Sequence, residues 1–327
     1  MQYRTFGRLG WLVSEIGHGT WGMGIGPSSW KGASDEESIA SLSASIEGGV
    51  NFIDTAWIYG RGHSERLIGK VLSNYRDRKV YVASKIPPKN FTWPSKRGDD
   101  IRNVFPRDHM LNYTKRTLAN LGQSSVDLML FHVWEDDWRK ELEWQETVQI
   151  LKKEGMVNAF GISVNTWEPW NVRRTLDTGL IDAVEVVYNI FEQRPEDELF
   201  PDCEKAGVAV IGRVPFDEGS LIGTMTTSTT FDKDDWRSSY FVRENLEQCI
   251  PRVEKIKELL PASMSMAHLA LRFILDNPLV ATVIPGMRRI CHVAENLAVS
   301  DASPLPRLLL EELRKYRWDR LPTSWSQ

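Results

Sequence analysis

Short apolar runs alternate along the chain with longer segments of mixed polarity. The runs are rich in β-branched residues and show little polar alternation, which is typical of strands buried on both faces of a parallel sheet. The eight runs span residues 14–20, 50–56, 79–85, 126–132, 159–164, 181–189, 207–213 and 281–286. We therefore predict eight parallel strands.

The segments between the runs are amphipathic and begin with residues that favour helix starts. Ser34, Ser64 and the stretch 106–108 precede the first three. Further helices are predicted at Glu143–Lys153, Glu168–Thr178, Glu196–Lys205, Met264–Asp276 and His292–Ser300. Regular alternation of strand and helix predicts an α/β fold, one closed (β/α)8 or TIM barrel, in preference to a six-stranded doubly wound sheet.

One spacing departs from this rhythm. About 70 residues separate the seventh run from the eighth, where about 30 would suffice for a crossover unit. We therefore expect an insertion between strand 7 and helix 7, residues 217–262, made of a polar loop and a helix at Asn245–Leu260. A C-terminal extension, the tail 300–327, contains another helical stretch. The whole chain, 1–327, is expected to be a single barrel domain.

Composition and charge narrow the class of partner. The chain has 327 residues, of which 42% are hydrophobic and 26% charged, as in folded globular proteins. Its net charge of -4, with intermixed signs, argues against a nucleic-acid partner. We find no apolar stretch of signal-peptide or membrane-spanning type, so we expect a cytoplasmic location and no membrane partner. No pattern indicates an oligomeric state.

The cysteines do not suggest a framework of disulfides or metal ligands. Cys203, Cys249 and Cys291 are odd in number and widely spaced, and the chain lacks an H-E-x-x-H motif. We expect thiols in or near the core and no metal site.

Polar residues close the predicted strands at the barrel end that carries chemistry. Asp54 ends the second strand, with Tyr59 five residues on; Lys85 ends the third and His132 the fourth. An adjacent ammonium stabilises a phenolate and lowers the pKa of the phenol, so we expect Lys85 to activate Tyr59 as an acid. Asp54 would hold Lys85, and His132 would donate a hydrogen bond to a carbonyl oxygen. This set predicts carbonyl reduction by an external hydride source.

Each of the four residues also has a structural explanation. Asp54 would serve as a cap, Tyr59 as a loop aromatic, Lys85 as a solvated cation and His132 as a core histidine. Their joint position at one barrel end favours the catalytic interpretation.

The motifs around these residues are similar to a known family. The stretch NFIDTAWIYGRGHSERLIGKVL at 51–72, VYVASK before residue 86, VDLMLFH at 126–132 and YNIFEQRPEDELFPDCEKAGVAVI at 188–211 carry the similarity. The chain resembles the aldo-keto reductase superfamily, in its bacterial NADPH-dependent form, over essentially its whole length. The resemblance implies reduction of aldehydes or ketones, with Tyr59 as proton donor, Lys85 and Asp54 tuning it, and His132 orienting the substrate oxygen.

The resemblance also implies a cofactor site, with departures from the family pattern. Ser163 is kept, but Val164 occupies the place of the family's carboxamide-binding Asn and Asn165 follows it; Glu185 replaces a Gln, and Arg213 an aromatic residue. Gly17–Gly22 matches G-x-G-x-x-G without a following helix, so it ends the first strand and sets Thr20 and Trp21 at the pocket. The implied cofactor residues are Thr20, Trp21, Asp54, Ser163, Asn165, Glu185, Arg213, Val214, Pro215, Gly219, Leu221, Gly286, Arg288, His292, Glu295 and Asn296.

Arg288 falls where the family reaches the 2′-phosphate of the cofactor. Because a guanidinium recognises a phosphate through two hydrogen bonds, NADPH is favoured over NADH as the cofactor.

Tryptophan placement suggests the kind of substrate. Of 13 Trp residues, five follow strands one to four, including Trp138, and another lies in the insertion. The candidate substrate residues are Trp21, Trp57, Trp93, Trp134 and Trp236. Aromatic walls favour a bulky or ring-containing carbonyl compound.

A second hypothesis comes from the same resemblance. Potassium-channel β subunits share this similarity and bind a nicotinamide cofactor while acting as regulatory, redox-sensing partners. They commonly lack the His of strand four, so His132 favours an enzyme.

Overall fold

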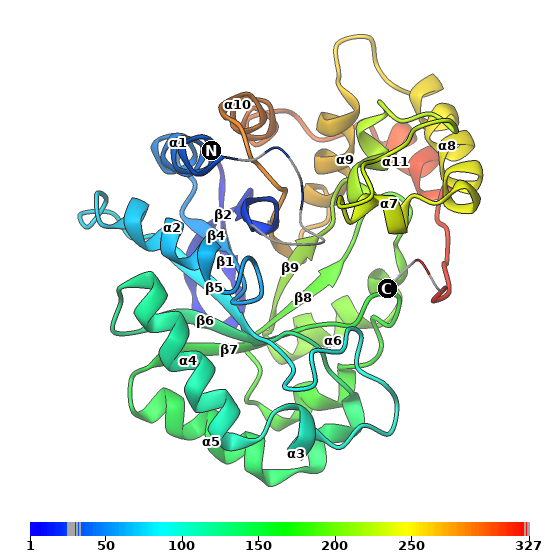
Figure 1. Ribbon diagram of the computed structural model, residues 1–327. Helices are drawn as coiled ribbons and strands as arrows, with labels where there is room; N and C mark the ends of the chain where they lie inside the picture. Colours follow the sequence, from blue (N-terminus) through cyan, green and yellow to red (C-terminus); the bar gives the residue numbers. More distant parts are fainter. Residues whose placement is uncertain (25–29, 31, 33, 324, 326–327) are drawn as a thin grey trace.

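The computed structural model describes residues 1–24, 30, 32, 34–323 and 325. Within them, eight parallel strands form one sheet and helices cover its outside (Figure 1). The strands are β3 (His18–Gly19), β4 (Phe52–Asp54), β5 (Tyr81–Ile86), β6 (Val126–Phe131), β7 (Val157–Ser163), β8 (Ala183–Val187), β9 (Ala209–Arg213) and β10 (Val280–Val283). All eight predicted strands are confirmed.

The sheet curls so that its two edge strands meet. Its order runs from β3 to β10 in sequence, and parallel bridges join Ile16 to Val283 and Gly19 to Gly286. A Cβ at residue 19 would lie 2.6 Å from the carbonyl oxygen of Ile284, so only glycine allows this approach. The sheet therefore curls into a barrel of the TIM type.

Helices follow the strands nearly as predicted. Ser34 caps the first, because its side chain accepts a hydrogen bond from the backbone of Glu37. The helices are α1 (Asp35–Glu47), α2 (His63–Leu72), α3 (Ile101–Val104), α4 (Arg107–Leu121), α5 (Leu142–Lys153), α6 (Leu199–Ala206), α7 (Arg237–Tyr240), α8 (Arg243–Glu258), α9 (Met266–Leu275), α10 (Ile290–Leu297) and α11 (Arg307–Arg314). None of the helices in the described part of the chain combines the length and apolarity needed to span a bilayer.

One predicted helix is wrong. At Glu168–Thr178 the chain forms only the 3-10 helix η4 (Arg173–Thr178). Pro169 disfavours helical backbone at the residue before it, and Trp167 has a φ of 67°. The start of an α-helix is therefore lost.

The segment between β9 and α9 contains η6 (Asp217–Ile222), α7 and α8. Figure 1 shows α7 and α8, in yellow, at the same end of the molecule as α9. Tyr240, Phe241 and Leu246 form a hydrophobic cluster there with Met225 and Ile250. The helix predicted at 245–260 is α8. The tail 300–327 holds α11, and its residues 324 and 326–327 lie outside the described ones.

An N-terminal hairpin, β1 (Tyr3–Phe6) and β2 (Trp11–Ser14), was not predicted. Phe6 is fully buried and packs 5.5 Å from Phe52, in a cluster with residues of β5 and β6. The hairpin thus packs on inward-facing residues of the barrel strands.

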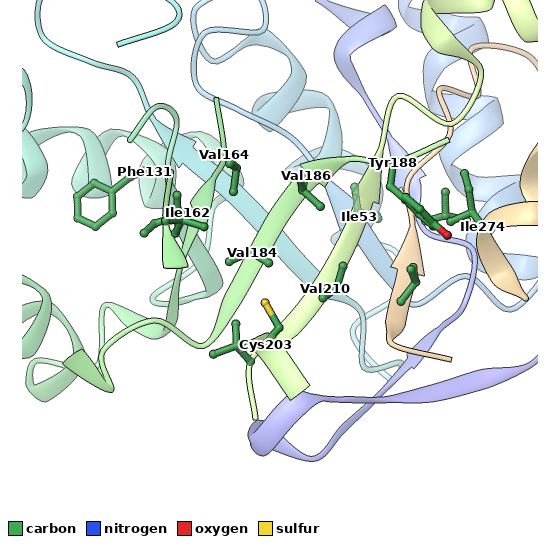
Figure 2. Close-up of a cluster of buried hydrophobic side chains, with 14 of the residues drawn as sticks. Ile53, Phe131, Ile162, Val164, Val184, Val186, Tyr188, Cys203, Val210 and Ile274 are labelled. Carbon is green, nitrogen blue, oxygen red and sulfur yellow. The ribbon is translucent and has the colours of Figure 1, made fainter. Parts of the chain in front are cut away.

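Side chains along a strand point alternately to its two faces, and in β8 this alternation turns a polar residue into the barrel near the catalytic end. Figure 2 shows Val184 and Val186 of β8 with Val210 of β9 in the hydrophobic core. Glu185 lies between the two valines, so its side chain points to the opposite face of the strand, into the barrel. This placement brings a carboxyl group to the site described next.

Candidate active site

The four residues predicted to be catalytic meet at the C-terminal ends of β4, β5 and β6. Lys85 Nζ donates hydrogen bonds to Asp54 Oδ1 at 2.6 Å and to the Thr55 carbonyl at 3.0 Å. The Lys85 ammonium lies 5.4 Å from the centre of the Tyr59 ring, and the rings of Tyr59 and His132 are 6.2 Å apart. A phenol, an ammonium and an imidazole therefore face one small volume.

Burial dominates the acidity of Tyr59. It raises the pKa of the phenol above its ordinary value, whereas the Lys85 ammonium acts to lower it. We expected Lys85 to bring the pKa of Tyr59 down overall; the net direction is upward, because the loss of hydration outweighs the nearby cation. Tyr59 therefore carries its proton at neutral pH.

Lys85 stays charged because two carboxylates surround it. Burial lowers its pKa, but Asp54 and Glu185 act in the opposite direction and hold the pKa above its ordinary value. Glu185 Oε2 lies 3.2 Å from Lys85 Nζ. Burial, and next the charge of Glu185, raise the pKa of Asp54 while Lys85 opposes them. Two carboxyl groups thus compete for one cation.

His132 is neutral in this environment. Burial, and then the charges of Lys85 and Arg213, hold its pKa well below the usual value. Its Nδ1 is buried and has no hydrogen-bond partner among the described residues. A neutral imidazole retains one N–H, which suits donation to an uncharged carbonyl oxygen.

A cavity of about 400 Å³ extends from Asp54 and Tyr59 to the loop after β10. Most of the predicted cofactor residues line it: Thr20, Trp21, Asp54, Glu185, Arg213, Val214, Pro215, Gly219, Gly286, Arg288, His292, Glu295 and Asn296. The sequence did not single out other lining residues, among them Trp30, Phe216, Glu218 and Arg237. Glu218 lies in the loop already proposed to contact the cofactor, and Arg237 is next to Trp236, so both could have been inferred.

Three predicted cofactor residues do not line the cavity. Asn165 is buried, and its side-chain amide bonds to both the backbone N–H and the carbonyl of Trp134 and to Ser95 Oγ. It therefore organises neighbouring loops, which corrects its assignment to the cofactor. Leu221 is fully buried beneath its loop, and Ser163 Oγ faces Glu185 Oε1 at 3.4 Å.

The tryptophans divide into two groups. Trp21 lies 6.5 Å from Tyr59 and 4.7 Å from Trp236, while Trp93 lies 5.6 Å from His132, all as ring-centre distances. These three surround the catalytic mouth.

The others pack within the protein. Trp57 contacts Tyr113 of α4, with 4.7 Å between ring centres. Trp134 is fully buried against Trp138 and Trp144. Their assignment to the substrate is therefore corrected, since their rings serve core packing.

Three features of the cavity bear on whether it would suit an elongated anionic ligand such as a nicotinamide dinucleotide. Arg213 Nη2 donates to the Val164 carbonyl at 3.1 Å, but its buried Nε has no hydrogen-bond partner among the described residues. At Gly286, a Cβ would meet nothing within 4 Å, so the backbone there borders open space. Arg288 and Arg237 also line the cavity, 5.1 Å and 4.5 Å from the Trp30 ring, and the Arg237 guanidinium is paired with Asp235. These residues fit an elongated anionic cofactor.

The chain is similar to known proteins over most of its length. A sequence model of the Aldo/keto reductase family matches residues 15–316. The NADH-specific methylglyoxal reductase of Escherichia coli (strain K12) is 28% identical over 322 residues, which cover 93% of this chain and 96% of that protein. A probable voltage-gated potassium channel subunit beta from Oryza sativa subsp. japonica is 27% identical over 327 residues, 93% of each protein.

A solved structure extends the similarity to the fold. The glycerol dehydrogenase AKR11B4 from Gluconobacter oxydans superposes with a TM-score of 0.78 at 25% identity, covering 99% of this chain and 98% of that one.

Proposed function

The chain belongs to the aldo/keto reductase family, and from that premise we propose that it reduces an aldehyde or ketone to an alcohol with NADPH, using Tyr59 as the proton donor. The observation that carries the proposal is the arrangement of Lys85, which is 2.6 Å from Asp54 and 5.4 Å from the Tyr59 ring. The Lys85 ammonium and the Tyr59 phenol are thereby held close together in a buried site.

The residues divide the chemical work. When bound, the reduced nicotinamide supplies a hydride to the carbonyl carbon. Tyr59 gives its phenolic proton to the carbonyl oxygen, and the Lys85 ammonium stabilises the phenolate that remains. Asp54 fixes the position of Lys85. His132 donates a hydrogen bond that orients the carbonyl oxygen before the transfer.

NADPH is proposed over NADH because of the guanidinium of Arg288. Arg288 lines the cavity beside His292 and Asn296, and Arg237 lines it as well. A guanidinium binds a phosphate with two charge-assisted hydrogen bonds, a contact that NADH cannot provide.

A bulky or ring-containing carbonyl compound is the proposed substrate. Trp21, Trp93 and Trp236 supply broad apolar faces near Tyr59 and His132. Such faces favour flat or extended apolar groups over small, highly charged ones. The inserted segment 217–262, within a single domain of residues 1–327, contributes Trp236 and Arg237 to this region.

The test is consumption of NADPH and of NADH with a panel of aldehydes and ketones of increasing size. We expect turnover with NADPH and the highest kcat/KM on aromatic or polycyclic carbonyls. Preference for small sugar phosphates would contradict the substrate class. Tight cofactor binding without turnover, unaffected by Tyr59→Phe, would instead support a regulatory subunit.

A further inference from the structure

Arg320, in the C-terminal tail, is buried at the catalytic end of the barrel. Its Nη2 donates to Asp217 Oδ1, and both side chains are at most 3% exposed. Asp217 begins η6, in the loop that follows β9 and lines the cavity. A tail residue is thus ion-paired with the loop proposed to hold the cofactor.

That loop has an unfavourable backbone. Val214, Asp217 and Glu218 have φ values of 56°, 47° and 57°, and Gly219 follows with 106°. Side-chain-bearing residues rarely adopt this left-handed region unless their surroundings hold them there. The carboxylate of Asp217 is held at both oxygens, by Arg320 and by Ser220 Oγ at 2.8 Å. These contacts fix the turn.

The result of the turn is that neighbouring side chains point in different directions. Asp217 faces the interior and is 1% exposed. Glu218, the next residue, lines the cavity together with Phe216 and Gly219. Loss of the contact to Asp217 would therefore free the backbone that shapes this wall.

Arg320 also contacts the loops that follow the two preceding strands. Its guanidinium carbon lies 4.1 Å from the ring centre of Trp167, after β7, and 6.0 Å from that of Phe191, after β8. Its Nη1 donates to the hydroxyl of Tyr240 in α7 at 3.3 Å. One side chain thereby joins the loops after β7, β8 and β9 with α7.

We propose that Arg320 is a positioning residue for the nicotinamide cofactor, acting through Asp217 to hold the loop 214–222 in its binding shape. This inference rests on the proposed function, since it requires the cofactor to occupy this cavity. Tyr59 lies in the loop after β4 and Lys85 on β5, across the barrel from β9. Loss of Arg320 should therefore weaken cofactor binding and accelerate release far more than it slows the chemical step.

The experiment measures NADPH binding by titration calorimetry and its release by stopped-flow displacement, beside kcat at saturating cofactor. Arg320→Met should weaken binding at least tenfold and accelerate release by a similar factor, with kcat changed less than threefold. Arg320→Lys, which keeps the charge, should recover part of the loss. Arg317→Met is the matched control, because Arg317 belongs to the same tail but pairs with Asp197 at 2.7 Å.

Asp217→Asn removes the other partner of the same ion pair, and it replaces Arg320→Met in the test if that variant does not fold. It should weaken NADPH binding to a similar extent, and Asp217→Asn with Arg320→Lys should lose no more than the larger single change. The inference would be overturned if Arg320→Met or Asp217→Asn bound NADPH as tightly as the wild type, or if Arg317→Met lost as much affinity as Arg320→Met. Either result would leave the proposed function standing. A wild-type protein that binds neither NADPH nor NADH would overturn the proposed function as well.

Discussion

The ammonium of Lys85 lies 3.2 Å from the carboxylate of Glu185, a contact additional to its hydrogen bond with Asp54. Glu185 is 2% exposed, and its other oxygen lies 4.0 Å from Arg213 Nε. Asp54, Lys85, Glu185 and Arg213 therefore form a row of alternating charges beneath the cavity. The acidity of Tyr59 depends on this row, since Lys85 lowers its pKa while Asp54 and Glu185 raise it.

Glu185→Gln should move the pH profile of reduction. Reduction requires the protonated phenol, so the rate falls as pH rises through the pKa of Tyr59. Removing the negative charge of Glu185 lowers that pKa, and kcat/KM should begin to fall roughly one pH unit earlier. Glu135→Gln, in a carboxyl group bonded to Ser95 and Asn171, is the control. An unchanged profile in Glu185→Gln would show that this carboxylate does not tune Tyr59.

The fold was predictable wherever burial leaves a continuous pattern. Within the run 181–189, the segment 183–187 is apolar except at Glu185, so both the strand and its inward polar residue can be identified. The hairpin 3–14 was missed because its short strands pack one side only. The helix at 168–178 failed because Pro169 opposes it locally while the polar pattern still resembles a helix.

The site was predictable where chemistry follows directly from strand ends, as for Asp54, Lys85 and His132. Contacts between loops could not be predicted from the sequence. Asn165 is one residue after the position of the family's carboxamide-binding Asn, but its side-chain amide is hydrogen-bonded to the Trp134 backbone and to Ser95. Arg320 lies 103 residues from Asp217, and no local pattern indicates that pairing.

Tyr59→Phe should lower kcat by about 10²- to 10⁴-fold, because the variant lacks the proton donor. The Phe ring fills nearly the same space, so cofactor affinity should stay within about twofold of wild type. Steady-state rates and calorimetric NADPH binding measure the two effects separately. Retained turnover would remove Tyr59 from its proposed role.

Arg288→Ala should weaken NADPH by about 10- to 100-fold and NADH by much less, since it removes the proposed partner of the 2′-phosphate. Arg289→Ala is the matched control, because Arg289 is exposed and lies 3.8 Å from Glu37. The measurement is the dissociation constant of each cofactor for the wild type and both variants. Equal losses for NADPH and NADH would contradict the assignment.

Trp93→Ala should raise KM for aromatic carbonyl substrates by about tenfold, because it removes an apolar face beside His132. KM for small aldehydes should change little. Trp57→Ala removes a ring that packs on Tyr113 and should not alter this selectivity. A uniform change across substrates in Trp93→Ala would show that its ring does not contact them.

Glu218 predicts a pH dependence of cofactor binding. Burial raises the pKa of its carboxyl group to about 8, with the charge of Arg213 acting in the opposite direction. Glu218 lines the cavity, so its ionisation places a negative charge beside an anionic cofactor. NADH affinity should therefore fall as pH rises through about 8, and Glu218→Gln should flatten this dependence. NADH is the suitable probe because it lacks the 2′-phosphate, which titrates near neutral pH.

The same carboxyl group links pH to stability. Its pKa is higher in the folded chain than its ordinary value, so the folded state binds the extra proton between those two values. Stability from this group is complete at acidic pH and is lost as pH rises through about 8. Chemical denaturation at several pH values should show a smaller decline in Glu218→Gln than in the wild type, whereas Glu254→Gln, an exposed glutamate of α8, should match the wild type. Identical declines in all three proteins would mean that Glu218 ionises normally, and the predicted fall in NADH affinity would then have no source.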